Sequence, residues 1–242
     1  MKKNTNLSEA ELRAGHRKRL RERFLADPQA LPDYELLELA LGCVYLRRDT
    51  KILAKRLLAH FGSFGALLAA PSEELTGVED CGPAVDSFLC LLREIIARSQ
   101  QSNVQRKRSV ILTDLVEMGR LRLMHCSDEE VWAALLDNQK RLLIFKKIRR
   151  GSPNHVALEP RDVVELMMKY HATGVVLMHN HPGGSYTPSP EDKTLTEKIA
   201  RVLQPLGLYM YDHVIITPEA SYSMRHGYCI ELSKRDILNM PE

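Results

Sequence analysis

The segment TGVVLMHNHPGGSYTPSPED, residues 173–192, decides the fold of the second half of the chain. Its apolar run is typical of a buried strand, and His179 and His181 stand at the end of that strand. Residues i and i+2 of an extended chain face the same side, so both imidazoles project from one face. Pro182 and two glycines permit a sharp reversal that returns Asp192 to the same point. Two histidines and one carboxylate leave a fourth position open, which is the layout of a catalytic zinc ion.

A second interpretation of this segment involves no metal. Histidine pairs at strand ends are commonly hydrogen-bonded, and short motifs have many false positives. Ser189, Pro190 and Asp192 also form a good helix start, with the serine as N-cap and the aspartate as the third helical residue. Capping alone would account for Ser189 and Asp192.

The hydrophobic pattern divides the chain in two. Apolar residues recur at helical spacing up to about residue 98, which predicts an α-helical N-terminal domain over residues 1–98. The polar stretch at residues 99–109 has no periodicity and predicts a linker. Beyond it, a β-hairpin (VWAALLD, then RLLIFKK), helical segments and two further strands alternate. Residues 110–242 are therefore expected to form an α+β or α/β domain.

Two parts of the N-terminal domain raise the question of nucleic-acid binding. Residues 71–96 predict a helix-hairpin-helix, whose backbone N–H groups suit a phosphate. Glu79 and Asp80 stand where a phosphate would approach, which favours a purely structural turn. The basic segment before residue 24 offers the alternative contact, although a solvated helix face explains it equally well. Its candidate cations are Arg17, Lys18, Arg19, Arg21 and Arg23.

Composition limits the class of protein. The chain has 242 residues with 44% hydrophobic and 27% charged residues and a formal net charge of +3, as in ordinary soluble proteins. No apolar run approaches the ~20 residues that span a bilayer, so we expect no membrane partner. The basic N-terminus lacks the apolar core of a secretory signal. Five scattered cysteines without a C-x-x-C pair indicate no disulfide framework, and favour the cytoplasm.

The spacing of the central motif resembles a known family. His-x-His, seven residues, Ser, two residues and Asp is the signature of the JAMM (MPN+) metalloproteases. The longer stretch EPRDVVELMMKYHATGVVLMHNHPGGSYTPSPED, with YDHVII and SYSMRHG, resembles the RadC family of bacterial JAMM-like proteins. GHRKRLRERF, DYELLELAL and RRDTKILAKRLL resemble the N-terminal region of that family. The resemblance covers nearly the whole chain from about residue 15, and implies a JAMM/MPN-like domain with a mixed sheet.

The resemblance also implies a ligand set and a base. One zinc ion (Zn²⁺) per chain would be held by His179, His181 and Asp192. A glutamate on a neighbouring strand would accept the proton of the attacking water and pass it to the leaving amine. Glu130 takes that position, with Glu129 as the runner-up because strand register is uncertain by one residue.

Three further residues belong to the family pattern. Ser189 would donate a hydrogen bond to the oxyanion of the tetrahedral intermediate. Asp212 and His213 are expected to be a buried pair whose side chains satisfy each other. The alternative is that they support the metal ligands from behind.

Two functions from different classes follow. The leading hypothesis is a zinc-dependent hydrolase of the JAMM type that cleaves a peptide or isopeptide bond in a protein or peptide substrate. The alternative is a DNA-associated repair or mobile-element protein whose metal domain is auxiliary or acts on nucleic acid. The alternative rests on the helical N-terminal domain, its basic segment and the family's traditional label as a DNA repair protein. That label says nothing about mechanism.

Overall fold

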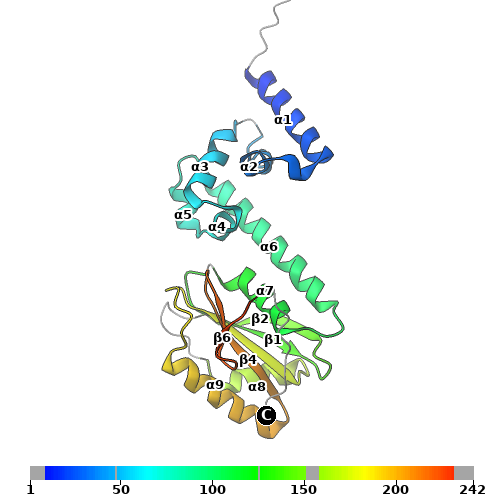
Figure 1. Cartoon of the computed structure of the whole chain (residues 1–242), viewed down its shortest axis with the longest axis vertical. Coiled ribbons are helices and arrows are strands. Elements are labelled where there is room, and N and C mark those ends of the chain that lie inside the picture. The colour runs from blue at the N-terminus through cyan, green and yellow to red at the C-terminus, as the bar shows by residue number, and fades with distance from the viewer. Residues whose placement is uncertain (1–8, 47, 125, 151–157, 232–242) are drawn as a thin grey trace, which may run out of the picture. The chain divides into compact units, whose positions relative to one another are not determined.

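The computed structural model describes residues 9–46, 48–124, 126–150 and 158–231 (Figure 1). The chain forms two compact units, Met1–Arg93 and Glu94–Glu242. Their boundary falls inside one long helix, α6 (Pro83–Gln105). Among the described residues, no helix is both long and apolar enough to cross a membrane.

The first unit is helical, which confirms the prediction for this half of the chain. Leucines at helical spacing form its core, among them Leu41, Leu57 and Leu89, each at most 1% exposed. Ser63 caps the start of α4 by accepting a hydrogen bond from the Ala66 N–H. Before α6 the elements are α1 (Glu9–Ala26), η1 (Pro28–Ala30), α2 (Asp33–Leu41), α3 (Lys51–Phe61), α4 (Phe64–Ala69) and α5 (Ser72–Gly77).

The turn between α5 and α6 is held by ion pairs. Asp80 has φ 72°, in the left-handed region that non-glycine residues rarely adopt. Its carboxylate pairs with Arg48 and, at 2.8 Å, with Arg56, whose guanidinium also lies 3.0 Å from Glu79. Both acids are therefore partnered within the unit. That this turn belongs to a helix-hairpin-helix stays a prediction.

The second unit contains a mixed six-stranded sheet in the order β2-β1-β3-β4-β5-β6, as predicted for a mixed sheet. β3 and β4 are parallel, and the other neighbouring pairs are antiparallel. Its strands are β1 (Glu130–Leu136), β2 (Leu142–Arg150), β3 (Gly174–Asn180), β4 (Tyr209–Ile216), β5 (Ser221–Ser223) and β6 (Tyr228–Cys229). Its helices after α6 are α7 (Leu112–Leu123), α8 (Pro160–Lys169), α9 (Pro190–Leu203) and η2 (Gln204–Leu206).

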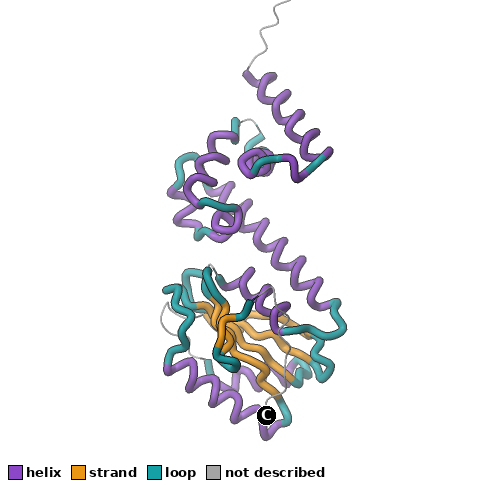
Figure 2. Tube along the Cα trace, in the orientation of Figure 1, coloured by secondary structure: helices purple, strands orange, loops and turns teal. Residues whose placement is uncertain are grey.

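Helices cover both faces of this sheet (Figure 2). On β1 and β3 the even-numbered residues, such as Ala134 and Met178, pack in one core with α7. The odd-numbered residues, such as Leu135 and Leu177, pack in the other core with α8 and α9. Alternation along a strand thus assigns each side chain to one face. His179 and His181 are odd-numbered, and His179 belongs to the α8–α9 face.

The first half of the expected linker is helical. Residues 99–105 complete α6, because Val104 is only 1% exposed and packs in the core beside α7. In the sequence, Val104 is the only apolar residue between 99 and 105, so this stretch shows no helical periodicity. The helix α7 follows directly, and its buried Leu115 and Val116 contribute to the same core.

Candidate metal centre

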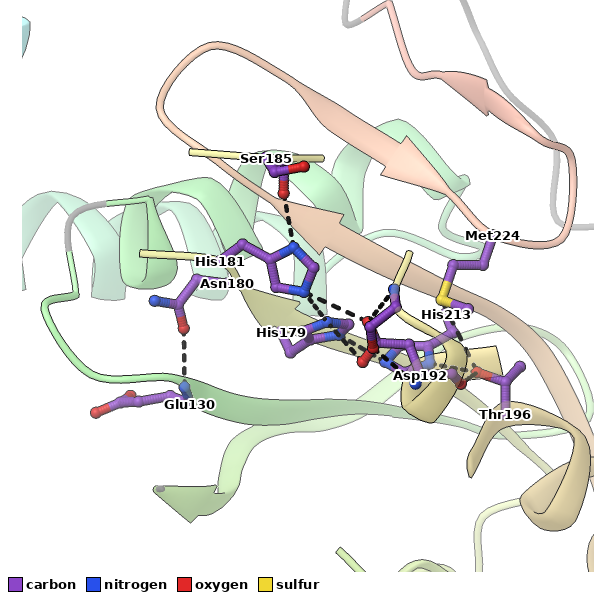
Figure 3. A network of polar contacts seen from close by, with 10 residues as sticks. Glu130, His179, Asn180, His181, Ser185, Asp192, Thr196, His213 and Met224 are labelled. Carbon is purple, nitrogen blue, oxygen red and sulfur yellow. Dashed lines mark hydrogen bonds and ion pairs between the residues drawn. The ribbon is translucent and has the colours of Figure 1, made fainter. Parts of the chain in front are cut away.

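Three side chains converge where β3 ends and α9 begins (Figure 3). The Nε2 atoms of His179 and His181 lie 3.0 Å apart. The carboxylate of Asp192 places Oδ1 3.2 Å from His179 Nε2 and Oδ2 3.4 Å from His181 Nε2. The loop between them turns through Gly184, which has φ 79°. The structure therefore brings together the three predicted ligands.

The spacing of these atoms fits a tetrahedral zinc ion. With Zn–N distances of about 2.05 Å, two ligand atoms of a tetrahedral site lie about 3.3 Å apart. The two Nε2 atoms lie 3.0 Å apart and Asp192 Oδ1 lies 3.2 Å from His179 Nε2, both close to that value. The three ligands line a cavity of about 640 Å³, which leaves room for a fourth ligand and a substrate.

Each histidine has its Nδ1 atom occupied by a partner outside the ligand cluster. His181 Nδ1–H donates to the Ser185 carbonyl at 2.6 Å, and a carbonyl can only accept. His179 Nδ1 lies 2.8 Å from Nε2 of His213. In the neutral form of His181 this arrangement leaves the Nε2 lone pair facing Asp192. Such partners on the far nitrogen are typical of histidines that ligate metals.

The charges of the cluster favour a bound cation. Burial alone would raise the pKa of Asp192, but the two imidazoles hold that pKa far below its ordinary range, so the carboxylate is ionised. The hydrogen bond to Asp192 raises the pKa of His181, outweighing the effect of burial. Without a metal, a proton on His181 offsets the repulsion among the acceptor atoms. A metal ion would take the place of that proton.

Asp212 and His213 do not pair through their side chains, which corrects our expectation. His213 lies behind His179, and burial holds its pKa well below the ordinary value, so its imidazole is neutral. Asp212 Oδ2 accepts a hydrogen bond from the Ser223 hydroxyl at 2.6 Å. Its Oδ1 accepts from the backbone N–H groups of His213 and Arg225. The contact of His213 with His179 is compatible with the alternative interpretation, support of a ligand, which stays a prediction.

Ser189 is the N-cap of α9, the alternative that the sequence left open. Its Oγ accepts a hydrogen bond from the Asp192 N–H at 3.0 Å. Its hydroxyl and backbone N–H both donate to Asp192 Oδ2, at 2.6 and 2.8 Å. With Oδ2 bound in this way, Oδ1 is the oxygen presented to a metal. The predicted donation to an oxyanion would require the hydroxyl proton to leave Asp192, and that role stays a prediction.

The structure does not bring Glu130 to the ligands. Its carboxylate accepts from the Trp132 indole N–H at 2.9 Å and lies 3.0 Å from Lys147 Nζ. Glu130 and Trp132 share the α7 face of β1, so the side chain points away from His179 (Figure 3). Glu129 instead lines the cavity, and its charge contributes to the raised pKa of His181. Of the two candidates, Glu129 is thus the one that shares a cavity with the candidate ligands, and the role of either as the base stays a prediction.

Asn180, which the sequence reasoning overlooked, positions the segment that contains Glu129. It lies between the two histidines, is 2% exposed and faces the opposite side of β3. Its Oδ1 accepts from the Glu130 N–H at 2.8 Å, and its amide donates to the carbonyls of Cys126 and Asp128 at 3.1 and 3.0 Å. The middle residue of His-Asn-His therefore anchors both flanks of Glu129 to the ligand strand.

The predicted nucleic-acid cations lie on α1 and are not equivalent. Arg17 donates to the carbonyls of Tyr45 (2.7 Å), Leu46 and Arg48, and so binds these three residues between α2 and α3. Arg23 pairs with Glu35 at 2.9 Å. Lys18, Arg19 and Arg21 are exposed. Contact of this segment with nucleic acid stays a prediction.

The chain is similar to known proteins over most of its length. The family described as the RadC-like JAB domain matches residues 111–228, which include all three candidate ligands. A UPF0758 protein of Ruegeria pomeroyi is 38% identical over 216 residues, covering 88% of this chain and 96% of the relative. A UPF0758 protein of Rhodobacter capsulatus is 38% identical over 208 residues, covering 85% and 97%. The JAB domain is the domain of JAMM-type metal-dependent hydrolases, and the His-His-Asp cluster described above lies within it. This chain belongs to the RadC family of JAB-domain proteins.

Proposed function

We propose that this chain is a zinc-dependent hydrolase of the JAMM type that cleaves a peptide or isopeptide bond. The observation that supports it most strongly is the convergence of three acceptor groups on one point in the wall of a cavity. Imidazole lone pairs that face a carboxylate repel it unless a proton or a metal cation lies between them. Nitrogen and oxygen ligands in a three-residue set suit zinc with one open position.

The residues around the ligands supply the remaining chemistry. When bound, zinc lowers the pKa of water and polarises a carbonyl. Glu129, which lines the cavity, would accept the proton of the attacking water and return it to the leaving nitrogen. Asn180 holds that glutamate in place through the backbone on both sides of it. Ser189 donates two hydrogen bonds to Oδ2 of Asp192, so Oδ1 would be the oxygen that faces the metal.

The charges of the cavity favour an amide substrate over a phosphodiester. Among the described residues that line the cavity, there are three acids besides Asp192 (Glu129, Glu159 and Glu191) and one lysine, Lys198. A polyanion entering such a cavity meets like charges, whereas a neutral peptide bond does not. Val131, Leu158 and Leu195 add apolar wall that suits a peptide chain. For this reason the nucleic-acid alternative is not assigned to the metal site.

Hydrolysis of a mixed substrate panel tests the proposal. Zinc-loaded full-length protein would be incubated with internally quenched peptides, with ε-linked isopeptides and with labelled oligonucleotides. We expect cleavage of a peptide or isopeptide substrate that is abolished by a chelator and by Asp192→Asn. Cleavage that survives Asp192→Asn, or cleavage of the oligonucleotides alone, would contradict the proposal.

A further inference from the structure

Thr196 lies one helical turn after the candidate ligand Asp192 and faces the same side of α9 (Figure 3). Its Oγ1 donates to the Asp192 carbonyl at 2.6 Å, the i−4 bond that threonine makes within helices. The same Oγ1 lies 2.7 Å from Nδ1 of His213. Thr196 therefore contacts both the backbone of Asp192 and the imidazole of His213, which in turn contacts His179.

Hydrogen bonds link the Asp192 carbonyl, Thr196, His213 and His179 in series. The position of each proton in this series follows from what each group is able to donate. A hydroxyl has one proton, and the Asp192 carbonyl can only accept, so the Thr196 proton lies on that bond. His213 Nδ1 must then donate to Thr196 Oγ1. The neutral His213 ring is left with a lone pair on Nε2, which accepts from His179 Nδ1–H. His179 Nε2 is consequently the unprotonated nitrogen that faces Asp192 and His181.

We propose that Thr196 is a positioning residue that fixes the tautomer of His179 through His213. The proposal rests on the proposed function only in taking His179 as a zinc ligand. Without the threonine oxygen, His213 loses the acceptor for Nδ1–H and is free to carry its proton on Nε2. His179 would then accept at Nδ1 and present Nε2–H to the metal, and a protonated nitrogen cannot ligate. The sulfur of Met224, 3.8 Å from Thr196 Oγ1, is a weak acceptor and does not replace it.

Thr196→Val and Thr196→Ser separate this role from packing. Valine keeps the shape of threonine but removes the hydroxyl, whereas serine keeps the hydroxyl and removes the methyl group. Thr194→Val is the matched control, because Thr194 makes the same i−4 bond, to the Pro190 carbonyl at 2.9 Å, two residues earlier in α9. If valine unfolds the protein, Thr196→Ala serves in its place.

Two measurements on full-length protein test the proposal without a substrate. Nitrogen-15 NMR of labelled histidines in the metal-free protein reports which ring nitrogen of His179 and His213 is protonated. Competition with a chelator reports zinc affinity. We expect Thr196→Val to move protons on both rings and to weaken zinc binding ~10- to 100-fold, as loss of such outer partners does. Thr196→Ser should restore both, and Thr194→Val should change neither.

The outcomes distinguish this proposal from the proposed function. Wild-type tautomers in Thr196→Val, or a serine variant that behaves like the valine variant, would overturn the positioning role. Wild-type protein that keeps the proposed tautomers but binds no zinc would overturn the proposed function and leave the hydrogen-bonded chain intact. A tautomer change without any loss of zinc affinity would show that the hydrogen bonds from Thr196 through His213 do not control zinc binding by His179, and would also overturn the proposal.

Discussion

Replacing Glu129 and Glu130 separately by glutamine tests the assignment of the base. Both changes keep the size of the side chain and remove its charge. Glu129 lines the cavity of the ligands, so Glu129→Gln should lower turnover ~10²-fold or more, which is about 2.7 kcal/mol of transition-state stabilisation. Zinc content and melting temperature should stay near wild type, because Glu129 is not a ligand.

Glu130→Gln should show the opposite pattern. The pair with Lys147 joins a nearly buried carboxylate to a lysine whose side chain is 42% exposed, so its loss should cost about 1 kcal/mol or less. For a chain of this size that corresponds to a fall of about 2–4 °C in melting temperature. The glutamine oxygen still accepts from Trp132, and turnover should change less than about 2-fold.

Turnover of a cleaved peptide, zinc content and thermal unfolding would be measured on all three proteins. If Glu130→Gln carries the loss of turnover instead, the base is Glu130 and the assignment to Glu129 is wrong. If neither change lowers turnover, neither glutamate is the base and the reasoning fails.

Two further predictions concern stability. The pKa of His181 is raised in the folded state, so its proton stabilises the metal-free protein fully below the unfolded pKa of about 6.5, and this contribution is lost as pH rises through the folded pKa. Calorimetry should therefore show that raising the pH from about 6 to about 8 lowers this contribution while the increase in melting temperature caused by zinc grows; a zinc effect that shrinks over this range would contradict the proton–metal exchange. Gly174→Ala would place its Cβ 2.1 Å from Tyr211 Cε2, a ring that is only 4% exposed and cannot move aside, and we expect a loss of ~3 kcal/mol or more in urea unfolding. Gly183→Ala meets open space and should leave stability unchanged, so equal losses in the two variants would refute the steric argument.

The ligand set could be predicted from the sequence because it depends on local geometry. His179 and His181 share a face through the period of a strand, and Asp192 is tied to them by a short turn and a helix start. Strand β3 and helix α9 could also be predicted, since a continuous apolar run and a Ser-Pro cap are strong local signals.

The register of the base could not be predicted, because one residue of slip exchanges the faces of a strand. β1 has an irregularity in its pairing with β2 between Val131 and Trp132, close to the two glutamates. The positions of Asn180 and Thr196 depend on tertiary partners 17 to 54 residues away in sequence, for which local periodicity has no signal. Helix α7 did have a signal, in Leu112, Leu115, Val116 and Leu123 at helical spacing, and it was missed.

The zinc content of the purified protein tests the central claim most directly. Full-length protein would be incubated with zinc, freed of excess metal by gel filtration and analysed for metal per chain, beside His179→Ala/His181→Ala and the exposed control His60→Ala. We predict one zinc per chain in the wild type and in the control, and almost none in the double variant, with folding of all three verified by circular dichroism. A folded double variant that retains a full equivalent of zinc, or a wild type that retains none, would contradict the metal centre described here.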